Sequence, residues 1–362
     1  MQVKDFLHYQ LIGLMSGTSL DGVDICHVDF FCKNNTWSYK IHNTRTYTYP
    51  EQLLKHLKNV VNLSGFELFS MDRQLGLFFG VCINRFITDF SIQKNEIAAI
   101  ASHGHTVFHQ PEKGLTVQIG CGESIAHTTG INTINDFRTK DVLHGGQGAP
   151  LVPIGDQLLF SGQADAFLNI GGFANFSIIN NDTSVTAFDI CPANILINYF
   201  TRQLGLEYDR NGMIASAHTV DAGLLKSLNE INTYHQLQPP SLGWEWVEKH
   251  ILPLFENYPI SLETKIATAT EHAAFQIAKR LNEYNCQTVF VTGGGAKNTF
   301  LISRIEHYFK GGVVLPDEET IDFKEALIFA FLGALHLENI PNCLPSVTGA
   351  SKAVVGGVMH LA

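Results

Sequence analysis

The chain has 362 residues, of which 45% are hydrophobic and 16% are charged, and this composition excludes an intrinsically disordered protein. Its 34 acidic and 24 basic residues give a formal net charge of −10. Because no Lys/Arg-rich run is present, nucleic acid is not an expected partner. At about 150 residues per domain, the length suggests two domains.

The seven cysteines are odd in number, widely spaced and without a CxxC pair. This pattern excludes a disulfide framework or a zinc ribbon and fits a reducing compartment. The first residues lack the basic-then-apolar order of a signal peptide, and no apolar run approaches the ~18 residues of a membrane span. We therefore expect a cytoplasmic protein with no membrane partner.

Strands alternate with helices along the whole chain, which predicts an α/β fold. The predicted elements of the first half are strands at 9–15, 23–31, 37–47 and 97–102 and helices near 51–63 and 70–90. Those of the second half are strands at 166–170, 176–180, 185–188 and 288–292 and helices at 193–204, 268–284 and 326–337, with Pro192 as the first residue of its helix.

Each half of the chain opens with a strand, a glycine turn and a second strand. This internal similarity predicts two related α/β domains around a ligand-binding cleft. We expect an N-terminal domain formed by residues 1–133 and 345–362. The C-terminal domain is expected to be formed by residues 134–344.

The first glycine turn, at 17–24, contains two glycines, two hydroxyl side chains and two carboxylates. Glycines let a backbone approach a phosphate closely, and the hydroxyls of Thr18 and Ser19 add donors. Asp21 and Asp24 could hold Mg²⁺ directly or through water. A simple β-hairpin turn explains the same residue types equally well.

The chain lacks the P-loop motif GxxxxGK[ST] and a GxGxxG that opens a βαβ unit. It has instead three glycine turns that follow strands, at 17–22, 171–172 and 293–295. Two of them could hold phosphates from opposite sides of a cleft, and the third could lie against a nucleoside.

Asp189 stands at the end of a predicted strand and just before a predicted helix. The positive end of a helix favours an ionised carboxylate. Because an ionised carboxylate at a strand end can accept a proton from a bound molecule, a general base is favoured over a structural role.

Arg138 could bind a substrate carboxylate as a two-pronged donor. A surface ion pair with Asp136 or Asp141 is as well supported by the spacing.

His103 and His105 share one face of a strand but have no acidic or Cys partner at a usual spacing. Sugar contacts or loop packing are therefore favoured over zinc. Glu325 stands three residues after Asp322, which fits either a helix capping box or a substrate ligand.

Several segments, in this order along the chain, resemble the anhydro-N-acetylmuramic acid kinases of the actin/hexokinase/Hsp70 ATPase superfamily. The segments are 13–24 (GLMSGTSLDGVD), 101–109 (ASHGHTVFH), 135–153 (NDFRTKDVLHGGQGAPLVP), 168–175 (LNIGGFAN), 188–194 (FDICPAN), 208–216 (YDRNGMIAS), 289–298 (VFVTGGGAKN) and 322–334.

The resemblance implies two related RNase H-like domains with mixed sheets that close over ATP, Mg²⁺ and a bicyclic sugar. It implies that water opens the 1,6-anhydro bond of anhydro-N-acetylmuramic acid while O6 is phosphorylated. The products would be N-acetylmuramate 6-phosphate and ADP, in peptidoglycan recycling. It also implies a homodimer.

The resemblance also assigns roles to individual residues. It makes Asp189 the base that deprotonates water. Residues assigned to ATP phosphates are Gly17, Thr18, Ser19, Leu20, Asp21, Gly22, Val23, Asp24, Asn169, Gly171, Gly172 and Asn175. Gly293, Gly294 and Gly295 are assigned to the adenosine side, and Arg138, His105 and Glu325 to the sugar.

The chain departs from the family pattern at three places. It has Asp-Ile-Cys-Pro at 189–192 where the family usually has Asp-Thr-Gly-Pro, and His105 where the family has Gln. Pro240 and Trp244 stand in place of two basic residues. These differences keep two alternatives open, a kinase of another sugar and a non-catalytic nucleotide-binding module.

Overall fold

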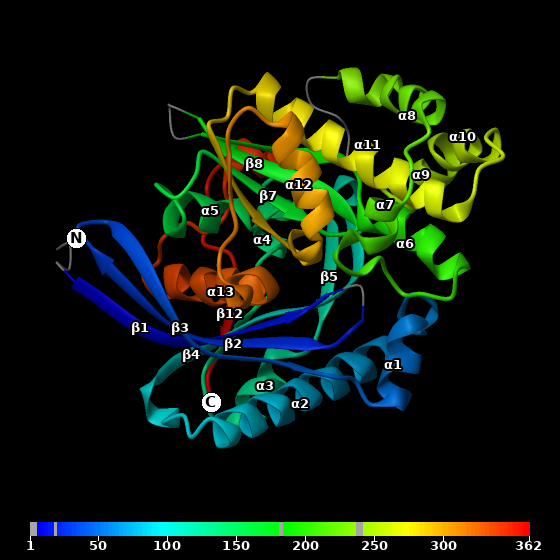
Figure 1. Cartoon of the computed structure of the whole chain (residues 1–362). Helices are drawn as coiled ribbons and strands as arrows, with labels where there is room; N and C mark the ends of the chain where they lie inside the picture. Colours follow the sequence, from blue (N-terminus) through cyan, green and yellow to red (C-terminus); the bar gives the residue numbers. More distant parts are fainter. Residues whose placement is uncertain (1–5, 18–19, 181–183, 237–241) are drawn as a thin grey trace. The chain divides into compact units, whose positions relative to one another are not determined.

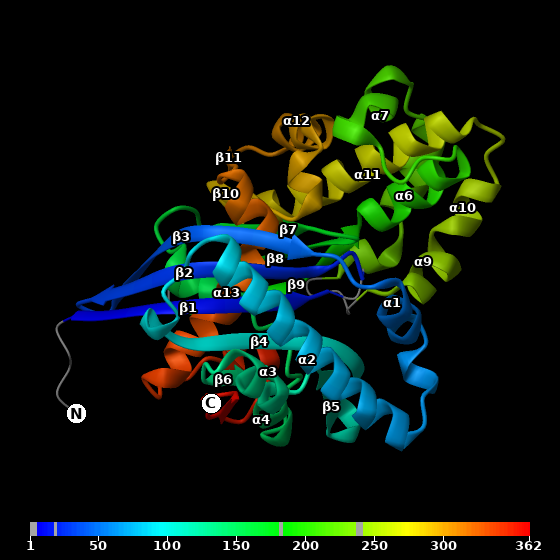
Figure 2. The same cartoon turned by 90° about the horizontal axis from the view of Figure 1, so that it is seen from below.

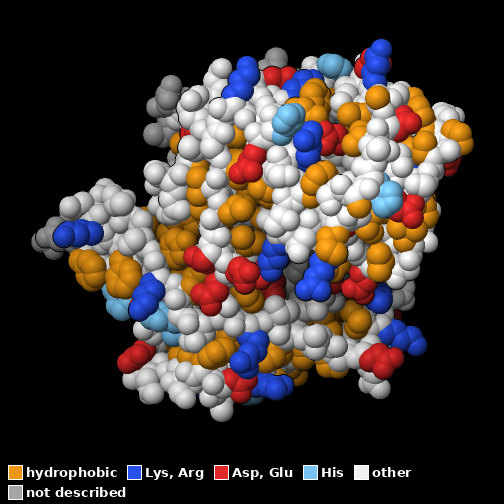
Figure 3. Space-filling view, in the orientation of Figure 1, with side chains coloured by type: hydrophobic (Ala, Val, Ile, Leu, Met, Phe, Trp, Pro, Cys, Tyr) orange, Lys and Arg blue, Asp and Glu red, His pale blue; other side chains and the backbone are white. Residues whose placement is uncertain are grey.

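The computed structural model describes residues 6–17, 20–180, 184–236 and 242–362. The chain forms two units (Figure 1), the first made of residues 1–159 and 323–362 and the second of residues 160–322. Within the described ranges, no helix is both long enough and apolar enough to cross a membrane. Acidic and basic side chains are interspersed over the face shown in Figure 3.

The first unit contains one mixed sheet and the helices that cover it. Its strands are β1 (Phe6–Ser16), β2 (Val23–Lys33), β3 (Thr36–Tyr47), β4 (Ile97–Gln110), β5 (Leu115–Ile119), β6 (Thr133–Asn135) and β12 (Val358–His360). Its helices are α1 (Glu51–Lys58), α2 (Gly65–Asp89), α3 (Gly122–Thr129), α4 (Thr139–Leu143), α5 (Pro153–Leu159), α14 (Pro345–Thr348) and most of α13 (Glu318–Leu337).

The strand order in this sheet is β12-β6-β4-β1-β2-β3, and β5 pairs with β4. β1, β2 and β3 form the predicted antiparallel meander. β4 is parallel to β1, and β6 is parallel to β4.

The apolar sequence of β1 reflects burial on both faces of the sheet. Ile12 and Leu14 pack in one core with side chains of α2, whereas Leu11 and Gly13 face α13. Figure 1 shows α2 and α13 on opposite sides of this sheet, and Figure 2 shows α2 lying across its strands. A Cβ at Gly13 would lie 1.9 Å from the carbonyl oxygen of Ala326, so this position requires glycine for α13 to approach the sheet.

The division of the chain differs from the expected boundaries at 134 and 344. Residues 134–159 and 323–344 pack with the first unit because they complete its sheet and cover it. β6 pairs with both β4 and β12. Gly155 of α5 lies so close to α13 that an added Cβ would meet Ile328 at 1.8 Å.

The second unit contains a five-stranded sheet and two groups of helices. The strands are β7 (Ala166–Ile170), β8 (Phe173–Ile179), β9 (Val185–Pro192), β10 (Thr288–Thr292) and β11 (Gly312–Val314). The helices are α6 (Asn194–Gln203), α7 (Met213–Ala217), α8 (Ala222–Asn229), α9 (Trp244–His250), α10 (Leu252–Glu256), α11 (Leu262–Glu283) and α12 (Thr299–Tyr308).

The second sheet repeats the topology of the first. β7, β8 and β9 form an antiparallel meander, β10 is parallel to β7, and β11 is parallel to β10. β1, β2, β3, β4 and β6 have the same order and directions in the first unit. The predicted relation between the two halves of the chain is therefore confirmed.

The two halves of α11 pack against different partners. Its C-terminal half, including Ala273, Ile277 and Leu281, covers the sheet. Its N-terminal half, including Ile266, packs with apolar residues of α6, α8, α9 and α10, which gather beside α11 in Figure 1. α11 therefore connects the helical group to the sheet.

Two predicted helix starts are wrong. Pro192 ends β9, and α6 begins at Asn194 with Ala193 as its N-cap residue. α13 begins at Glu318, so Asp322 lies inside the helix and forms no capping box. The Asp317 carboxylate instead accepts a hydrogen bond from the Thr320 N–H of the first turn, at 2.7 Å.

We predict that Gly13→Ala destabilises the first unit by about 1–3 kcal/mol, because the added methyl group meets backbone rather than a movable side chain. Denaturant unfolding followed by circular dichroism would measure the change. Gly65→Ala is the matched control, since nothing lies within 4 Å of its added Cβ. Equal stability of the Gly13→Ala variant and the wild type would contradict the close approach of α13.

Candidate active site

The first glycine turn is the connection of a β-hairpin. β1 and β2 stay paired up to Ser16 and Val23, and the Leu20 N–H donates to the Gly17 carbonyl at 3.2 Å. Thr18 and Ser19 lie outside the described residues. The hairpin interpretation is confirmed, and it is compatible with a phosphate loop because both uses need the same tight backbone.

Packing accounts for part of the turn without a ligand. A Cβ on Gly22 would lie 2.6 Å from Thr46 Cγ2 and 2.8 Å from the Tyr47 carbonyl oxygen on β3. Val23 is fully buried in the core. Packing of these two residues therefore shapes the turn.

The carboxylates of the turn differ in their surroundings. Asp21 is exposed, whereas Asp24 is half-buried and its Oδ1 accepts a hydrogen bond from the Thr46 hydroxyl at 2.5 Å. The described residues include no group of three or more His, Cys, Asp or Glu side chains arranged to hold a metal ion. A donor set of two carboxylates fits Mg²⁺, which keeps several waters and takes phosphate oxygens as further ligands.

A buried polar network joins the end of β1 to β4. The Ser16 hydroxyl lies 2.6 Å from the Tyr49 hydroxyl and 3.1 Å from His105 Nδ1. Burial lowers the pKa of His105, so this side chain is neutral at pH 7. His105 therefore supports the turn and can offer a neutral ring to a sugar hydroxyl.

Arg138 is held inside the first unit by two neighbours. Its Nε and Nη2 atoms donate to His103 Nε2 at 3.0 and 2.9 Å, and Nη1 donates to the Gly148 carbonyl at 2.7 Å. His103 Nδ1 lies 2.9 Å from the Gly104 carbonyl, which fixes Nδ1 as the donor. Burial and the Arg138 charge hold the pKa of His103 well below its ordinary value.

The surface ion pair with Asp136 or Asp141, which was the alternative for Arg138, is not formed within the described part of the chain. Asp136 instead accepts the Thr139 N–H at 3.2 Å, and Asp141 accepts the Gly148 N–H at 2.8 Å. Three contacts use three of the five N–H groups of the Arg138 guanidinium.

Glu325 joins this group from α13. Loss of solvation raises the pKa of Glu325, the negative charge of Asp24 adds to this effect, and Arg138 opposes it. Glu325 as a whole residue is nevertheless exposed. The first unit therefore brings Asp24, Arg138 and Glu325 within electrostatic range of one another.

In the second unit, three polar residues lie in one row across the sheet. Asn169 of β7 faces Asn175 of β8, and Asn175 faces Asp189 of β9. Directly opposed residues on antiparallel strands point to the same face. Each of the three is half-buried, so the row is open to solvent.

Two glycine turns meet at Asn169. Gly293 has φ 80° and a Cβ there would lie 2.5 Å from Asn169 Oδ1, whereas Asn169 Nδ2 lies 3.7 Å from a Cβ built on Gly171. A Cβ on Gly295 would meet Ile170 at 2.2 Å, but nothing lies within 4 Å of one on Gly294. Packing therefore requires Gly293 and Gly295, and Gly294 is the open position of its turn.

The turn at 171–172 is bonded to the start of α6. The Gly172 carbonyl accepts the N–H groups of Ala193 and Ile195 at 2.8 and 3.0 Å, and the Gly171 carbonyl accepts that of Asn194 at 3.3 Å. Because three N–H groups at the start of α6 bond to the carbonyls of the turn, they hold its backbone in one conformation.

The Asp189 carboxylate is hydrogen-bonded to a distant segment of the second unit. Its Oδ2 atom accepts the Leu242 N–H at 2.8 Å. Burial raises the pKa of Asp189, and the Leu242 hydrogen bond opposes this rise. The carboxylate is thus a stronger base than an ordinary Asp while one donor still stabilises its charged form.

The bulky residues after Asp189 point away from it. Ile190 and Cys191 are fully buried in the core with α11, where the Cys191 thiol lies 3.9 Å from the Ala273 carbonyl oxygen. Their size therefore does not crowd the carboxylate.

Trp244, which replaces a basic residue of the family pattern, packs its ring 5.5 Å from that of Tyr199. Pro240 lies outside the described residues.

Sequence reasoning did not single out Ser16, Tyr49, Thr46 or Leu242. Ser16 adjoins the glycine turn and could have been found there. Tyr49 and Thr46 meet the turn only through the pairing of β2 with β3, and Leu242 contributes a backbone N–H that leaves no signal in side-chain type.

Comparisons with known proteins agree over almost the whole chain. A family model described as anhydro-N-acetylmuramic acid kinase matches residues 9–362. The anhydro-N-acetylmuramic acid kinase of Shewanella amazonensis is 37% identical, with 96% of this chain and 97% of that protein covered. That of Pasteurella multocida is 34% identical, with 96% of each covered.

Among solved structures, component A of the (R)-2-hydroxyglutaryl-CoA dehydratase of Acidaminococcus fermentans is similar with a TM-score of 0.46 and 11% identity, covering 89% of this chain and 96% of that one. The match of the family model and the identity to curated relatives extend from β1 to β12. The chain belongs to the anhydro-N-acetylmuramic acid kinase family.

Proposed function

We propose that this enzyme opens the 1,6-anhydro ring of anhydro-N-acetylmuramic acid with water and transfers the γ-phosphoryl group of ATP to O6. The observation that carries the proposal is Asp189, a half-buried carboxylate with a raised pKa. It lies within β9, which continues to Pro192, and not at the predicted strand end. Membership of the kinase family and the names of the relatives support the choice of sugar and of the phosphoryl donor.

The proposed reaction is balanced without a further reactant. Asp189 accepts a proton from water as the water oxygen bonds to the anomeric carbon, and the bond from that carbon to O6 breaks. O6 bonds to the γ-phosphorus as the bond to the β–γ bridging oxygen breaks, and ADP leaves. Because phosphorus captures O6, no separate acid is needed for the leaving oxygen.

We assign the phosphates to residues of both units. In the first unit they are Gly17, Thr18, Ser19, Leu20 and the hairpin up to Asp24. In the second unit they are Asn169, Gly171, Gly172 and Asn175, with Gly293, Gly294 and Gly295 on the adenosine side. The convergence of the two second-unit turns at Asn169 supports this assignment.

We assign Mg²⁺ to Asp21 and Asp24, where it would neutralise charge on the phosphates. The hydrogen bond from Thr46 orients the Asp24 carboxylate and leaves room for a metal-bound water, because a carboxylate accepts about four hydrogen bonds. Full activity in the presence of excess chelator would contradict this assignment.

We assign the sugar to Arg138, His105 and Glu325. Arg138 offers its remaining N–H groups to a carboxylate, and anhydro-N-acetylmuramic acid carries one. Glu325 and His105 can accept or donate hydrogen bonds to hydroxyl groups. Their grouping in the first unit supports this role.

A second candidate is a kinase of the same superfamily that acts on another sugar. The packing of Trp244 on Tyr199 favours it, because an aromatic pair stands where the family has a basic side chain. ADP release measured over a panel of sugars separates the two candidates. Faster turnover of another sugar than of anhydro-N-acetylmuramic acid would favour the second.

We also propose that the enzyme is a cytoplasmic homodimer, as the family resemblance implies. Light scattering of the purified protein tests the dimer, and cell fractionation tests the compartment. A monomer, or a membrane-bound or secreted pool, would contradict the respective part.

Asp189→Asn should bind ATP with unchanged affinity and lose at least about 100-fold in kcat, because the amide cannot accept the proton from water. Coupled detection of ADP and calorimetric titration of ATP measure the two quantities. Glu230→Gln, a change at an exposed carboxylate of the same unit, is the control and should behave as wild type. Activity of the Asp189→Asn variant within tenfold of wild type would refute the role of Asp189.

The pH dependence of kcat/KM should show its acid limb above the usual pKa of Asp, which is about 3.9. Asp189 acts as a base only when ionised, and burial raises its pKa, so activity falls as the pH drops through this raised value. Circular dichroism at each pH separates this loss from unfolding. An acid limb at or below pH 3.9 would contradict the assigned environment.

A further inference from the structure

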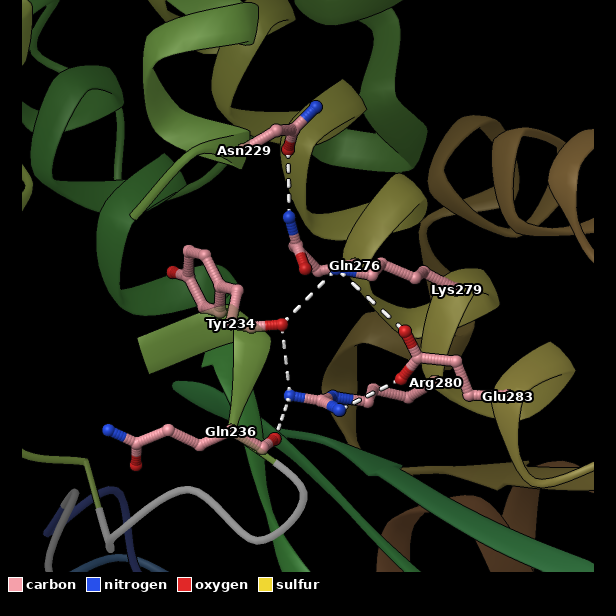
Figure 4. Close-up of polar contacts among 7 residues, drawn as sticks. All are labelled: Asn229, Tyr234, Gln236, Gln276, Lys279, Arg280 and Glu283. Atoms are coloured by element: carbon pink, nitrogen blue, oxygen red, sulfur yellow. Dashed lines mark hydrogen bonds and ion pairs between the residues drawn. The ribbon is translucent and has the colours of Figure 1, made fainter. Parts of the chain in front are cut away.

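Arg280 of α11 is a buried arginine that binds backbone carbonyl groups. It is 4% exposed, and its Nη2 atom donates to the Tyr234 and Gln236 carbonyls at 3.1 and 2.7 Å (Figure 4). Its Nη1 atom donates to Glu283 Oε2 at 2.8 Å. Burying a charge is costly unless hydrogen bonds compensate, so these contacts hold Arg280 and the segment in one arrangement.

Other residues of the same face of α11 bind the same segment. His272 and Gln276 contact the Asn229 carboxamide oxygen at 2.7 and 2.9 Å. Lys279 Nζ donates to the Tyr234 carbonyl at 3.2 Å, so this oxygen accepts from two cations. Figure 4 shows the contacts of Gln276, Lys279 and Arg280 with this segment. The chain from Asn229 to Gln236 is thus fastened to α11 by polar contacts.

Two routes lead from Arg280 to Asp189. The Arg280 guanidinium carbon lies 5.9 Å from the ring centroid of Phe188, the residue before Asp189. The Tyr234 ring meets that of Trp246 edge-on at 5.9 Å, and Trp246 belongs to α9, which begins two residues after Leu242. Leu242 supplies the N–H that binds Asp189.

We propose that Arg280 is a positioning residue for the catalytic base. It holds the Tyr234 carbonyl, and the Tyr234 ring contacts Trp246 of α9. This contact holds the start of α9, and with it the Leu242 N–H, beside the Asp189 carboxylate. The contact of Arg280 with Phe188 steadies β9 next to Asp189. This role rests on the proposed function of Asp189.

Arg304 of α12 provides a matched comparison. It donates from Nε and Nη2 to Glu271 of α11 at 2.7 and 2.6 Å, so it also links α11 to a neighbour through a charged side chain. No contact of Arg304 with the segment from Tyr234 to Leu242 occurs among the described residues. Replacing Arg304 therefore tests the effect on stability of losing an arginine that is ion-paired with its neighbour, without the proposed positioning effect.

The experiment compares Arg280→Met, Arg280→Lys, Glu283→Gln and Arg304→Met in the full-length enzyme. Arg280→Met should lower kcat by about 10- to 100-fold with the KM for ATP within about twofold of wild type, because misplacement of a base by about 1 Å is that costly. Its acid limb should move to higher pH, since loss of the Leu242 hydrogen bond removes what opposes the raised pKa of Asp189.

Hydrogen–deuterium exchange supplies a readout that does not depend on the reaction. The peptide that contains Leu242 should exchange faster in Arg280→Met than in wild type or Arg304→Met. Arg280→Lys keeps a cation that can reach a carbonyl and should recover part of kcat. Glu283→Gln removes the ion pairs of Glu283 with Arg280 Nη1 and with Lys279 Nζ. It keeps the bonds of Arg280 to the two carbonyls and should leave the pH profile unchanged.

An unchanged acid limb and unchanged exchange at Leu242 in both Arg280 variants would overturn the proposal. So would a loss of kcat in Arg304→Met equal to that in Arg280→Met at matched stability. If Arg280→Met does not fold, Arg280→Lys decides by the same readouts. If the wild-type enzyme does not turn over anhydro-N-acetylmuramic acid, the proposed function is refuted. The exchange data then still test whether Arg280 positions Leu242.

Discussion

The account of catalysis depends on the hydrogen bond between the half-buried Asp189 carboxylate and the Leu242 N–H. Burial alone would favour the neutral acid, which cannot accept a proton, and full exposure would leave an ordinary weak base. The hydrogen bond from Leu242 opposes the rise in the pKa of Asp189 that burial causes. Ile190 and Cys191 fill the core behind the carboxylate, so the residues that depart from the family pattern anchor the strand and do not enter the site.

In the first unit, the close approach of α13 to β1 positions a residue of the proposed site. Gly13 lets the backbone of α13 approach β1, and this approach places Glu325 near Asp24 and Arg138. Phe331 of the same helix packs against Phe30 and Trp37, which fixes its rotation over the sheet. Glu325 is therefore positioned by ordinary core packing, and no dedicated loop is needed to hold it.

The strands were largely predictable from the sequence, whereas several helix starts and most long-range contacts were not. β7 and β10 were predicted with their correct bounds, because the apolar runs 166–170 and 288–292 are short, buried and followed directly by a glycine. β4 continues to Gln110, beyond the predicted end at 102, because Gly104 adopts φ 76° without ending the pairing. The sequence near Arg280 indicates only its ion pair with Glu283, because the two carbonyl groups that it binds lie more than 40 residues away and are backbone atoms.

The most direct test of the proposed reaction is mass spectrometry of the product formed from anhydro-N-acetylmuramic acid, ATP and Mg²⁺ in ¹⁸O-labelled water. The account predicts one ¹⁸O atom at the anomeric hydroxyl and none in the phosphate, because water attacks the anomeric carbon and O6 keeps its own oxygen. Label in the phosphate group, or a phosphorylated sugar whose anhydro ring is intact, would contradict it.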